Sequence, residues 1–427
     1  MENNISVIEN EILKEKVYKT KLDNGLDIYI CKKDGFTKKI GMFGTKYGSL
    51  NNDFVNIEDG KRITVPDGIA HFLEHKLFEQ EGENALDLFS KEGISANAYT
   101  SFDHTVYFFE TISKFKTGLE MLIKLVKTPY FTTENVNKEQ GIIGQEISMY
   151  DDDPNFMVYF NTLRAMYINN PVRIDIAGTI ESISHIDKDV LYTCYNTFYN
   201  PNNMFMVIIG DVDVQNTINI IKQNLSLYEK ETKKKEIIKY YPDEPSNILE
   251  KKIEKNMGIY MPQISIGYKL DLVEKNEIIK REVISEIISE MYFSKSSSFY
   301  EKEYNNSLVN DDIDFIYEGT KTISHILIST SSSNPQKIME DITEYINNIK
   351  NEKINLKLFN NIKRKKIGEN ILMSEDLNNS YRRIIDSILN ANTLYYDIEI
   401  LNNITENDIT DFLNLLTDES KVYSVVK

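Results

Sequence analysis

The first half of the chain alternates between strand-like and helical hydrophobic patterns. Alternating residues on both sides of an Asn-Gly pair predict a β-hairpin over residues 21–32. Residues 94–111 alternate and are rich in Tyr, Phe, Thr and Val, so they predict two strands with a turn between them. Apolar positions with helical period predict helices over residues 69–78 and 133–150. Another strand is expected over residues 39–47 and further helices over residues 83–91, 113–127, 190–198 and 213–225.

Residues 229–258 differ in character, because a charge-dense run is followed by prolines, and they predict a linker. The second half then repeats the mixture of patterns. Strands are predicted over residues 263–270, 313–318 and 322–330, and helices over residues 275–291, 334–349, 356–371 and 378–389. The sequence therefore predicts an α+β protein with an α/β domain at residues 1–228, the linker at 229–258, and a second α/β domain at residues 259–427.

Composition is that of a water-soluble globular protein. The chain has 427 residues, of which 41% are hydrophobic and 27% charged. We find no run of about 18 apolar residues and no secretory signal at the start of the sequence, so we expect no membrane span and a cytoplasmic location. The cysteines, Cys31 and Cys194, match no metal or redox spacing, which favours a reducing compartment.

The formal net charge of −17 argues against nucleic-acid partners, because an acidic surface repels phosphates. An acidic cavity would favour basic substrates, but a solvated acidic surface is the simpler interpretation.

The strongest chemical signal is His71-Phe72-Leu73-Glu74-His75 on the predicted helix at residues 69–78. Two histidines four residues apart lie on one helical face, and their imidazoles can ligate one Zn²⁺. Glu74 projects beside them, so its carboxylate can act as a general base on a zinc-bound water. The pattern H-x-x-E-H is the inverzincin signature.

A catalytic zinc site needs a third protein ligand and one open position. Glu139 and Glu146 are seven residues apart on the predicted helix at residues 133–150, so they share a face. One can ligate the metal while the other supports a ligand histidine. Taken alone, both are typical of solvated helix carboxylates, whereas H-x-x-E-H by chance is improbable in a chain with five histidines. We predict structural roles for His104, His185 and His325.

Several separated segments resemble the M16 peptidases, the family of pitrilysin, insulin-degrading enzyme and mitochondrial processing peptidase. They are residues 68–75 (GIAHFLEH), 97–100 (NAYT), the Glu139 to Glu146 region, 178–183 (GTIESI) and 199–204 (YNPNNM). The resemblance to the short bacterial members is clear over about residues 20–215 and fainter beyond. It implies two tandem homologous α/β domains with antiparallel-rich sheets, as in M16 half-clam subunits.

The resemblance also implies a role for each candidate residue. The zinc ligands would be His71, His75 and Glu146, with Glu74 as base, Glu139 as the carboxylate supporting a ligand histidine, and Asn97, Ala98, Tyr99 and Thr100 as the edge strand that binds substrate. An edge strand suits this task because it captures an extended peptide through main-chain hydrogen bonds.

In the family, four such domains close around a chamber, so a chain of this length implies a dimer. Family members often carry an Arg and a Tyr, seven residues apart, that reach the partner's site. The corresponding register here places Glu303 and Asn310 at those positions. This departure favours a heterodimer, in which a related zinc-free chain carries the pair, over a homodimer.

The sequence thus predicts a zinc endopeptidase that cleaves peptides or an unfolded precursor or leader peptide in a closed chamber. Two other classes stay open: a non-catalytic scaffold subunit, whose mark would be a broken zinc motif, and a module that binds peptides without turnover. The sequence does not name the substrate.

Overall fold

The chain folds into two compact units, each built from discontinuous segments. The computed structural model describes residues 5–228, 236–390 and 393–427. Unit 1 comprises Met1–Ile147, Asp175–Tyr241 and Ile371–Leu389, and unit 2 comprises Ser148–Ile174, Pro242–Asn370 and Asn390–Lys427. These units differ from the continuous ranges expected from the sequence. Residues 229–235 of the expected linker lie outside the described residues.

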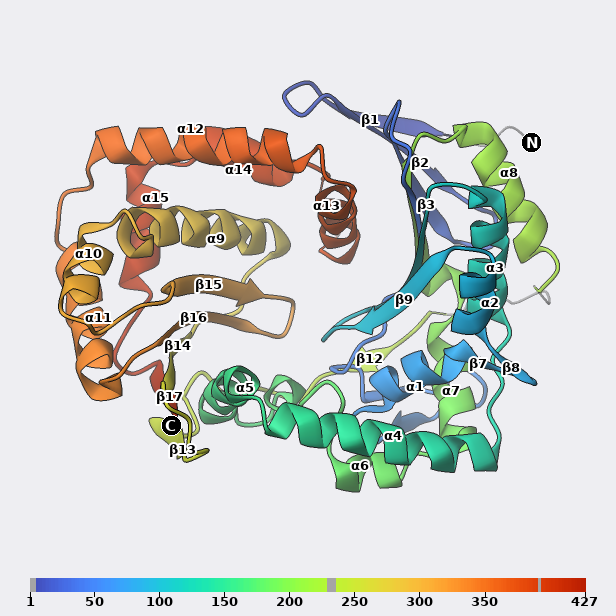
Figure 1. Ribbon diagram of the computed structural model, residues 1–427, viewed down its shortest axis with the longest axis horizontal. Helices are drawn as coiled ribbons and strands as arrows, with labels where there is room; N and C mark the ends of the chain where they lie inside the picture. Colours follow the sequence, from blue (N-terminus) through green and yellow to red (C-terminus); the bar gives the residue numbers. More distant parts are fainter. Residues whose placement is uncertain (1–4, 229–235, 391–392) are drawn as a thin grey trace. The chain divides into compact units, whose positions relative to one another are not determined.

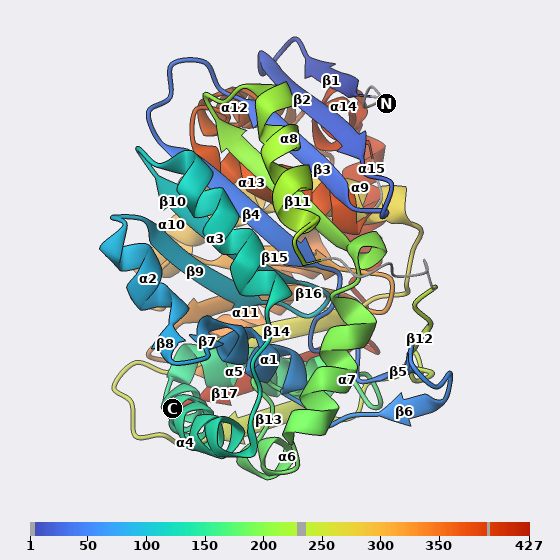
Figure 2. The same ribbon diagram turned by 90° about the vertical axis from the view of Figure 1, so that its right-hand side faces the viewer.

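Unit 1 is organised around a seven-stranded sheet in the order β1-β2-β3-β11-β4-β10-β9, which Figure 2 shows face-on. Neighbouring strands are antiparallel except β3 and β11. The strands are β1 (Ser6–Asn10), β2 (Glu15–Lys21), β3 (Asp27–Lys32), β4 (Lys39–Thr45), β9 (Ser95–Thr100), β10 (Thr105–Thr111) and β11 (Met204–Gly210). Smaller sheets pair β5 (Asp53–Val55) with β6 (Arg62–Thr64) and β12 (Lys239–Tyr240), and β7 (Glu79–Gln80) with β8 (Glu83–Asn84).

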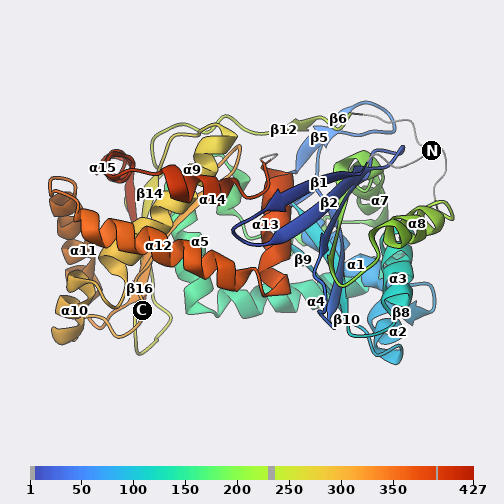
Figure 3. The same cartoon turned by 90° about the horizontal axis from the view of Figure 1, so that it is seen from above.

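Helices cover both faces of this sheet. The helices of unit 1 are α1 (Ile69–Phe78), α2 (Ala85–Lys91), α3 (Phe115–Lys127), α4 (Thr133–Asp151), α6 (Ile180–Ser184), α7 (Lys188–Phe198), α8 (Val214–Leu225) and α13 (Leu377–Leu389), and a 3₁₀ turn, η2, spans Pro201–Asn203. In Figures 1 and 3, α3 and α8 lie on one side of the sheet and α13 on the other. One boundary between the two units falls within α4.

The main core of unit 1 lies between the sheet and the helices on the side of α1, α3 and α8. Ile28, Phe43 and Ile208 point into it from the strands, and Phe72 and Leu122 from the helices. Burying each such large apolar side chain contributes about 1.5–3 kcal/mol relative to exposing it. This packing fixes α1, the helix with the H-x-x-E-H motif, against the sheet.

Unit 2 contains a five-stranded sheet in the order β13-β17-β14-β16-β15. Its strands are β13 (Lys252–Lys255), β14 (Gln263–Lys269), β15 (Asp314–Gly319), β16 (Ser324–Ser331) and β17 (Lys421–Val426). Its helices are α5 (Pro154–Met166), α9 (Lys275–Ile288), α10 (Ser298–Asn305), α11 (Pro335–Ile349), α12 (Leu356–Met373), α14 (Tyr396–Asn403) and α15 (Glu406–Asn414), with a 3₁₀ turn η1 (Pro171–Arg173) and a π-helical turn η3 (Ser289–Phe293). None of the helices in the described ranges is both long and apolar enough to cross a bilayer.

The two sheets share one topology. In unit 1 the last strand, β11, lies between β3, to which it is parallel, and β4, and the series continues through β10 to β9. In unit 2 the last strand, β17, likewise lies between the parallel β13 and the antiparallel β14, and the series continues through β16 to β15. This repetition confirms the predicted α+β class with two tandem α/β domains.

The discontinuity of the units follows from two helices at matching positions in the two halves of the chain. The helix α5 follows the long α4 of the first half and packs on β14 and β17 of unit 2. The helix α13 follows the long α12 of the second half and packs on β11 of unit 1. Residues 378–389 thus form the predicted helix, but this helix packs on the sheet of unit 1 and not on the sheet of unit 2.

Candidate active site

The helix α1 begins at a glycine that no other residue can easily replace. Gly68 precedes the helix with φ 86°, in the left-handed region that favours glycine. A Cβ at this position would lie 2.3 Å from the carbonyl oxygen of Ala177, far inside van der Waals contact. Gly68 therefore sets the start and direction of α1.

The two faces of α1 have different tasks. Ile69, Phe72, Leu73 and Leu77 are buried in the core of unit 1. With a period of 3.6 residues, this anchoring places His71 and His75 together on the other side. Their ring centroids are 4.5 Å apart.

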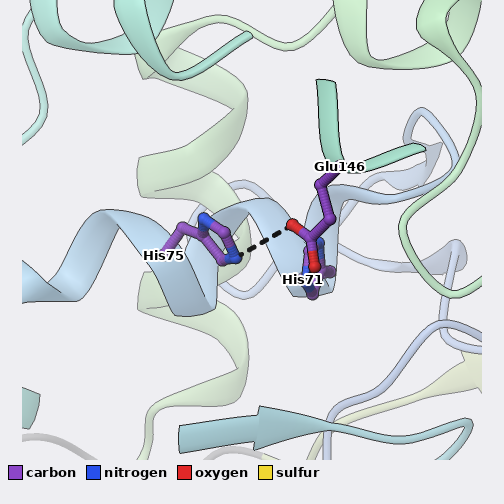
Figure 4. A group of neighbouring side chains, drawn as sticks. All are labelled: His71, His75 and Glu146. Carbon is purple, nitrogen blue, oxygen red and sulfur yellow. Dashed lines mark ion pairs between the residues drawn. The ribbon is translucent and has the colours of Figure 1, made fainter. Parts of the chain in front are cut away.

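Helix α4 brings Glu146 over the two histidines, and Figure 4 shows the three side chains converging. Glu146 Oε1 lies 3.8 Å from His71 Nε2, and Glu146 Oε2 lies 3.5 Å from His75 Nε2. One ligand atom from each residue falls within 4.8 Å of the other two. Within the described residues this is the only such cluster of His, Cys, Asp or Glu side chains.

The cluster fits a zinc ion. Nitrogen and oxygen ligands about 2.0–2.1 Å from a tetrahedral Zn²⁺ lie about 3.3 Å from one another. The separations of 3.5 and 3.8 Å between Glu146 and the two imidazoles are close to that value. Two imidazoles and one carboxylate also form a donor set that Zn²⁺ uses in catalytic sites, which leave the fourth position open.

Glu139, one of the two candidate carboxylates on α4, contacts a histidine from behind. Its Oε1 lies 3.1 Å from His75 Nδ1, whereas His75 Nε2 faces Glu146. A carboxylate that accepts the Nδ1 proton leaves the Nε2 lone pair free and fixes the ring orientation. The geometry thus distinguishes two residues whose roles the spacing alone left open: Glu146 faces both imidazoles and Glu139 supports one.

The two histidines differ in their electrostatic surroundings. Burial, together with the charge of His75, lowers the pKa of His71 to about 3, so its imidazole is neutral at neutral pH. Burial also lowers the pKa of His75, but the hydrogen bond to Glu139 and the carboxylates of Glu74 and Glu146 outweigh it and raise that pKa overall. Within the described part of the chain, the buried His71 Nδ1 has no hydrogen-bond partner.

Glu74, the predicted base, lies in a buried position beside the cluster. Its Oε2 accepts a hydrogen bond of 2.7 Å from Thr100 Oγ1. Burial raises the pKa of Glu74, and the Thr100 hydroxyl partly opposes this because it stabilises the charged carboxylate. A half-fixed carboxylate with a raised pKa is suited to accept and return a proton.

The strand β9, which contains the predicted substrate-binding residues, is an edge strand. Among the described residues it pairs only with β10, through Ala98 opposite Tyr107 and Asn97 opposite Phe108. Because side chains alternate along a strand, Ala98 and Thr100 face the side of α1, whereas Tyr99 faces the side of α13. The second edge of β9 is therefore available for another strand.

A cavity of about 560 Å³ opens beside Glu74 and His75. It is bounded by α1, the β7–β8 hairpin, β9 and α4, all within unit 1. Its lining residues include Phe78, Gln80, Asn97, Tyr130, Glu139 and Ile142. The cavity is large enough to hold a side chain of a bound peptide next to Glu74, the candidate base.

Other residues singled out in the sequence lie outside this cluster. Glu303 on α10 is fully buried, and Asn310 lies on an exposed loop. His104 is hydrogen-bonded to Asp103, and His325 is hydrogen-bonded to both Tyr167 and Glu318.

Two features of the site went unnoticed in the sequence. The family resemblance implies only a substrate-binding role for Thr100 on the edge strand, whereas its hydroxyl donates a hydrogen bond to Glu74. Lys76 directly follows the motif and is fully buried behind it. The alternation of side chains along β9 is a signal for the Thr100 contact, because it places Thr100 on the face toward α1. The burial of Lys76 has no comparable signal in the sequence, because charged residues are normally exposed.

Comparison with known proteins identifies the family. The model of "Insulinase (Peptidase family M16)" matches residues 55–180, and that of "Peptidase M16 inactive domain" matches residues 185–366. Together with the fold and the His71, His75 and Glu146 cluster, these matches define the class of protein as a two-domain peptidase with H-x-x-E-H on a helix. The chain belongs to peptidase family M16.

Relatives cover most of the chain. The protein described as an uncharacterized zinc protease, YmfH, of Bacillus subtilis is 42% identical over 80% of each chain. The structure of a putative M16-like peptidase from Alicyclobacillus acidocaldarius superposes with a TM-score of 0.91 and 30% identity, covering 98% of this chain and 99% of that one. Pitrilysin matches with a TM-score of 0.76 and 15% identity over all of this chain but 47% of its own length.

Proposed function

We propose that this chain is a zinc-dependent endopeptidase that cleaves peptides or an unfolded precursor in a chamber closed by a second subunit. The observation that carries the proposal is the convergence of His71, His75 and Glu146, with ligand atoms within 4.8 Å, beside the buried carboxylate of Glu74. The name of YmfH, a zinc protease, supports the same metal.

His71, His75 and Glu146 would hold the metal, and Glu139 would orient His75. Zn²⁺ bound there supplies Lewis acidity toward the scissile carbonyl and lowers the pKa of a coordinated water.

Glu74 carries the proton through the reaction. Its carboxylate accepts the proton of the attacking water as the oxygen adds to the carbonyl carbon. It then passes that proton to the amide nitrogen, so that the C–N bond breaks and a carboxylic acid and an amine are released. The hydrogen bond from Thr100 keeps one oxygen of Glu74 fixed while the other exchanges the proton.

The free edge of β9 would present the peptide. An extended substrate adds to an edge strand through main-chain hydrogen bonds, which makes little demand on its sequence. Because Thr100 at the end of β9 contacts Glu74, a peptide paired with this strand runs past the base. A side chain of the substrate can enter the cavity lined by Phe78, Tyr130 and Ile142.

A dimer is proposed because the chain matches half of pitrilysin. The buried Glu303 and the exposed Asn310, at the positions of the expected Arg and Tyr, favour a partner that differs from this chain. Copurification from native cells followed by mass spectrometry tests this point. A related second chain supports the heterodimer, and two identical chains contradict it.

A metal-free scaffold is the alternative from another class. The second half offers no second metal cluster among its described residues. The intact cluster of unit 1 favours catalysis over scaffolding, because a scaffold has no need of an open metal position beside a base.

The test compares wild type with Glu74→Gln, both purified from native cells so that a bound partner is retained. We expect both proteins to contain stoichiometric zinc, whereas only wild type hydrolyses a quenched unstructured peptide. The matched control is Glu81→Gln, an exposed glutamate on the neighbouring hairpin, which should cleave at the wild-type rate.

Cleavage by Glu74→Gln at the wild-type rate would show that Glu74 is not the base. A wild-type protein that holds no zinc would leave the scaffold as the better description. Binding of peptide without loss of substrate over time would indicate a peptide-binding module instead.

A further inference from the structure

Lys76 is a lysine whose side chain is completely buried directly behind the candidate metal centre. It follows His75 on α1, so its side chain leaves the helix about 100° away from that of the histidine. Ammonium groups are strongly hydrated, and burying one is unfavourable unless hydrogen-bonded, oppositely charged partners replace water. A fully buried lysine therefore requires an explanation.

Three groups on two elements surround the Lys76 ammonium. It donates one hydrogen bond, of 3.2 Å, to the carbonyl oxygen of Asn135 and another to the carboxylate of Glu79. Its Nζ also lies 3.9 Å from Glu139 Oε2, within ion-pair distance. Glu79 and Asn135 would suffice to tie the end of α1 to α4, but the third contact reaches the metal centre.

Glu139 stands between Lys76 and His75. Its Oε1 faces His75 Nδ1 at 3.1 Å, and its Oε2 faces Lys76 Nζ at 3.9 Å. The carboxylate is largely buried, so these neighbours take the place of water around it. A cation at Oε2 keeps the other oxygen turned toward the imidazole, and the imidazole keeps its Nε2 turned toward Glu146.

We propose that Lys76 is a positioning residue for the metal centre, acting through Glu139 on His75. Its ammonium holds the Glu139 carboxylate in the orientation that accepts the Nδ1 proton of His75. The contact thereby raises the affinity for zinc. The inference rests on the proposed zinc site but not on peptide cleavage.

The test is a double-mutant cycle on zinc affinity, measured by competition with a chelator dye using Zn²⁺ itself. The variants are Lys76→Met, which keeps the length of the side chain without its charge, Glu139→Gln, and the double variant. We expect each single change to weaken zinc binding about 10- to 100-fold, as removal of groups that orient metal ligands usually does. In the Glu139→Gln background, Lys76→Met should add little, because the group it acts through is already neutral.

Charge balance provides a second variant if Lys76→Met folds poorly. Lys76→Met combined with Glu79→Gln removes the ammonium together with one of its carboxylates, so Glu139 is the one remaining carboxylate that loses its cation, while the Asn135 carbonyl loses a hydrogen bond. It should keep native circular dichroism while its zinc affinity stays about tenfold or more below that of Glu79→Gln alone. The exposed Lys116→Met is the matched control and should bind zinc like wild type.

Two results would overturn the proposal. Unchanged zinc affinity in Lys76→Met, or in Lys76→Met with Glu79→Gln relative to Glu79→Gln, would reduce Lys76 to a structural tie between α1 and α4. Losses that multiply independently in the double variant with Glu139→Gln would show that Lys76 does not act through Glu139. Both results are measured as zinc affinity, which does not require peptide cleavage. Failure of the Lys76 proposal can therefore be distinguished from failure of the proposed peptidase activity.

Discussion

Thr100 Oγ1 donates a hydrogen bond of 2.7 Å to Glu74 Oε2, which joins the edge strand β9 to the helix with the H-x-x-E-H motif. The contact couples the element that would bind the peptide to the group that would move its proton. The Thr100 hydroxyl is in turn 3.3 Å from that of Thr105 on the adjacent strand β10, so its position is fixed from the sheet.

Thr100→Val tests this coupling. Valine preserves the shape of threonine but removes the hydroxyl donor, and a hydrogen bond to a charged group contributes about 1.5–3 kcal/mol. If most of this free energy is lost from the orientation of the Glu74 carboxylate, kcat should fall about 10- to 100-fold with zinc content unchanged. Steady-state kinetics and metal analysis check this. Wild-type kcat in Thr100→Val would mean that the hydroxyl has no part in orienting Glu74.

Pairing of substrate with β9 predicts a periodic response to backbone methylation. In a paired strand, only every second residue directs its N–H toward the partner. A scan of N-methyl groups along one cleavable peptide should therefore lower kcat/KM at alternating positions near the cleaved bond. A response that follows side-chain identity, with no period of two, would argue that pockets and not the strand edge select the substrate.

Gly68→Ala should destabilise unit 1. The alanine must adopt φ near 86° and meets the Ala177 carbonyl, so we expect a loss of about 1–3 kcal/mol in the free energy of unfolding. Gly141 lies inside α4, and nothing within 4 Å would meet an added Cβ there. Gly141→Ala should therefore stabilise by about 0.5–1 kcal/mol. Urea unfolding measures both, and equal effects of the two substitutions would contradict this account.

Cys31 and Cys194 should be unreactive in the native protein. Both are fully buried, and burial is the main cause that raises the pKa of each thiol to about 12. At pH 8 the reactive thiolate is therefore scarce and shielded. A disulfide reagent should label neither cysteine in native protein and both in denaturant. Labelling of native protein within minutes would show that one of them is accessible.

Glu244 should make the stability of unit 2 depend on pH. Burial disfavours its charge, but Lys269 and the backbone N–H groups of residues 168–170 bond the carboxylate and lower its pKa below the usual value. Its contribution is present above about pH 4.5 and is lost as the pH falls through the lowered pKa. Glu244→Gln should cost about 1–3 kcal/mol at pH 7 and progressively less below pH 4. A difference from wild type that does not vary with pH would contradict the assignment.

The elements that carry His71, His75 and Glu146 could be predicted well, since local patterns determine them. The helix over residues 69–78 matches α1 at both ends, and the helix over residues 133–150 matches α4 except at its last residue. The turn between residues 94 and 111 separates β9 from β10 as expected. Strong periodicity and a glycine before α1 explain this success.

Long-range features escaped the sequence. The helix α4 ends one residue beyond its predicted end, but Asp153 then caps a new helix with Pro154 in its first turn. That α5 and α13 each cover the sheet built mainly by the other half of the chain depends on tertiary packing, which no local pattern encodes. The burial of Lys76 is of the same kind, because its partners Asn135 and Glu139 are about 60 residues away.

We propose that His71, His75 and Glu146 hold a zinc ion on which peptide cleavage depends. The most direct measurement is zinc per chain, with peptide turnover followed through chelation and zinc restoration, in wild type and in His75→Ala. We predict stoichiometric zinc and turnover that chelation abolishes and zinc restores in wild type, and neither zinc nor turnover in His75→Ala. Stoichiometric zinc in His75→Ala, or turnover that persists after complete removal of metal, would contradict the account.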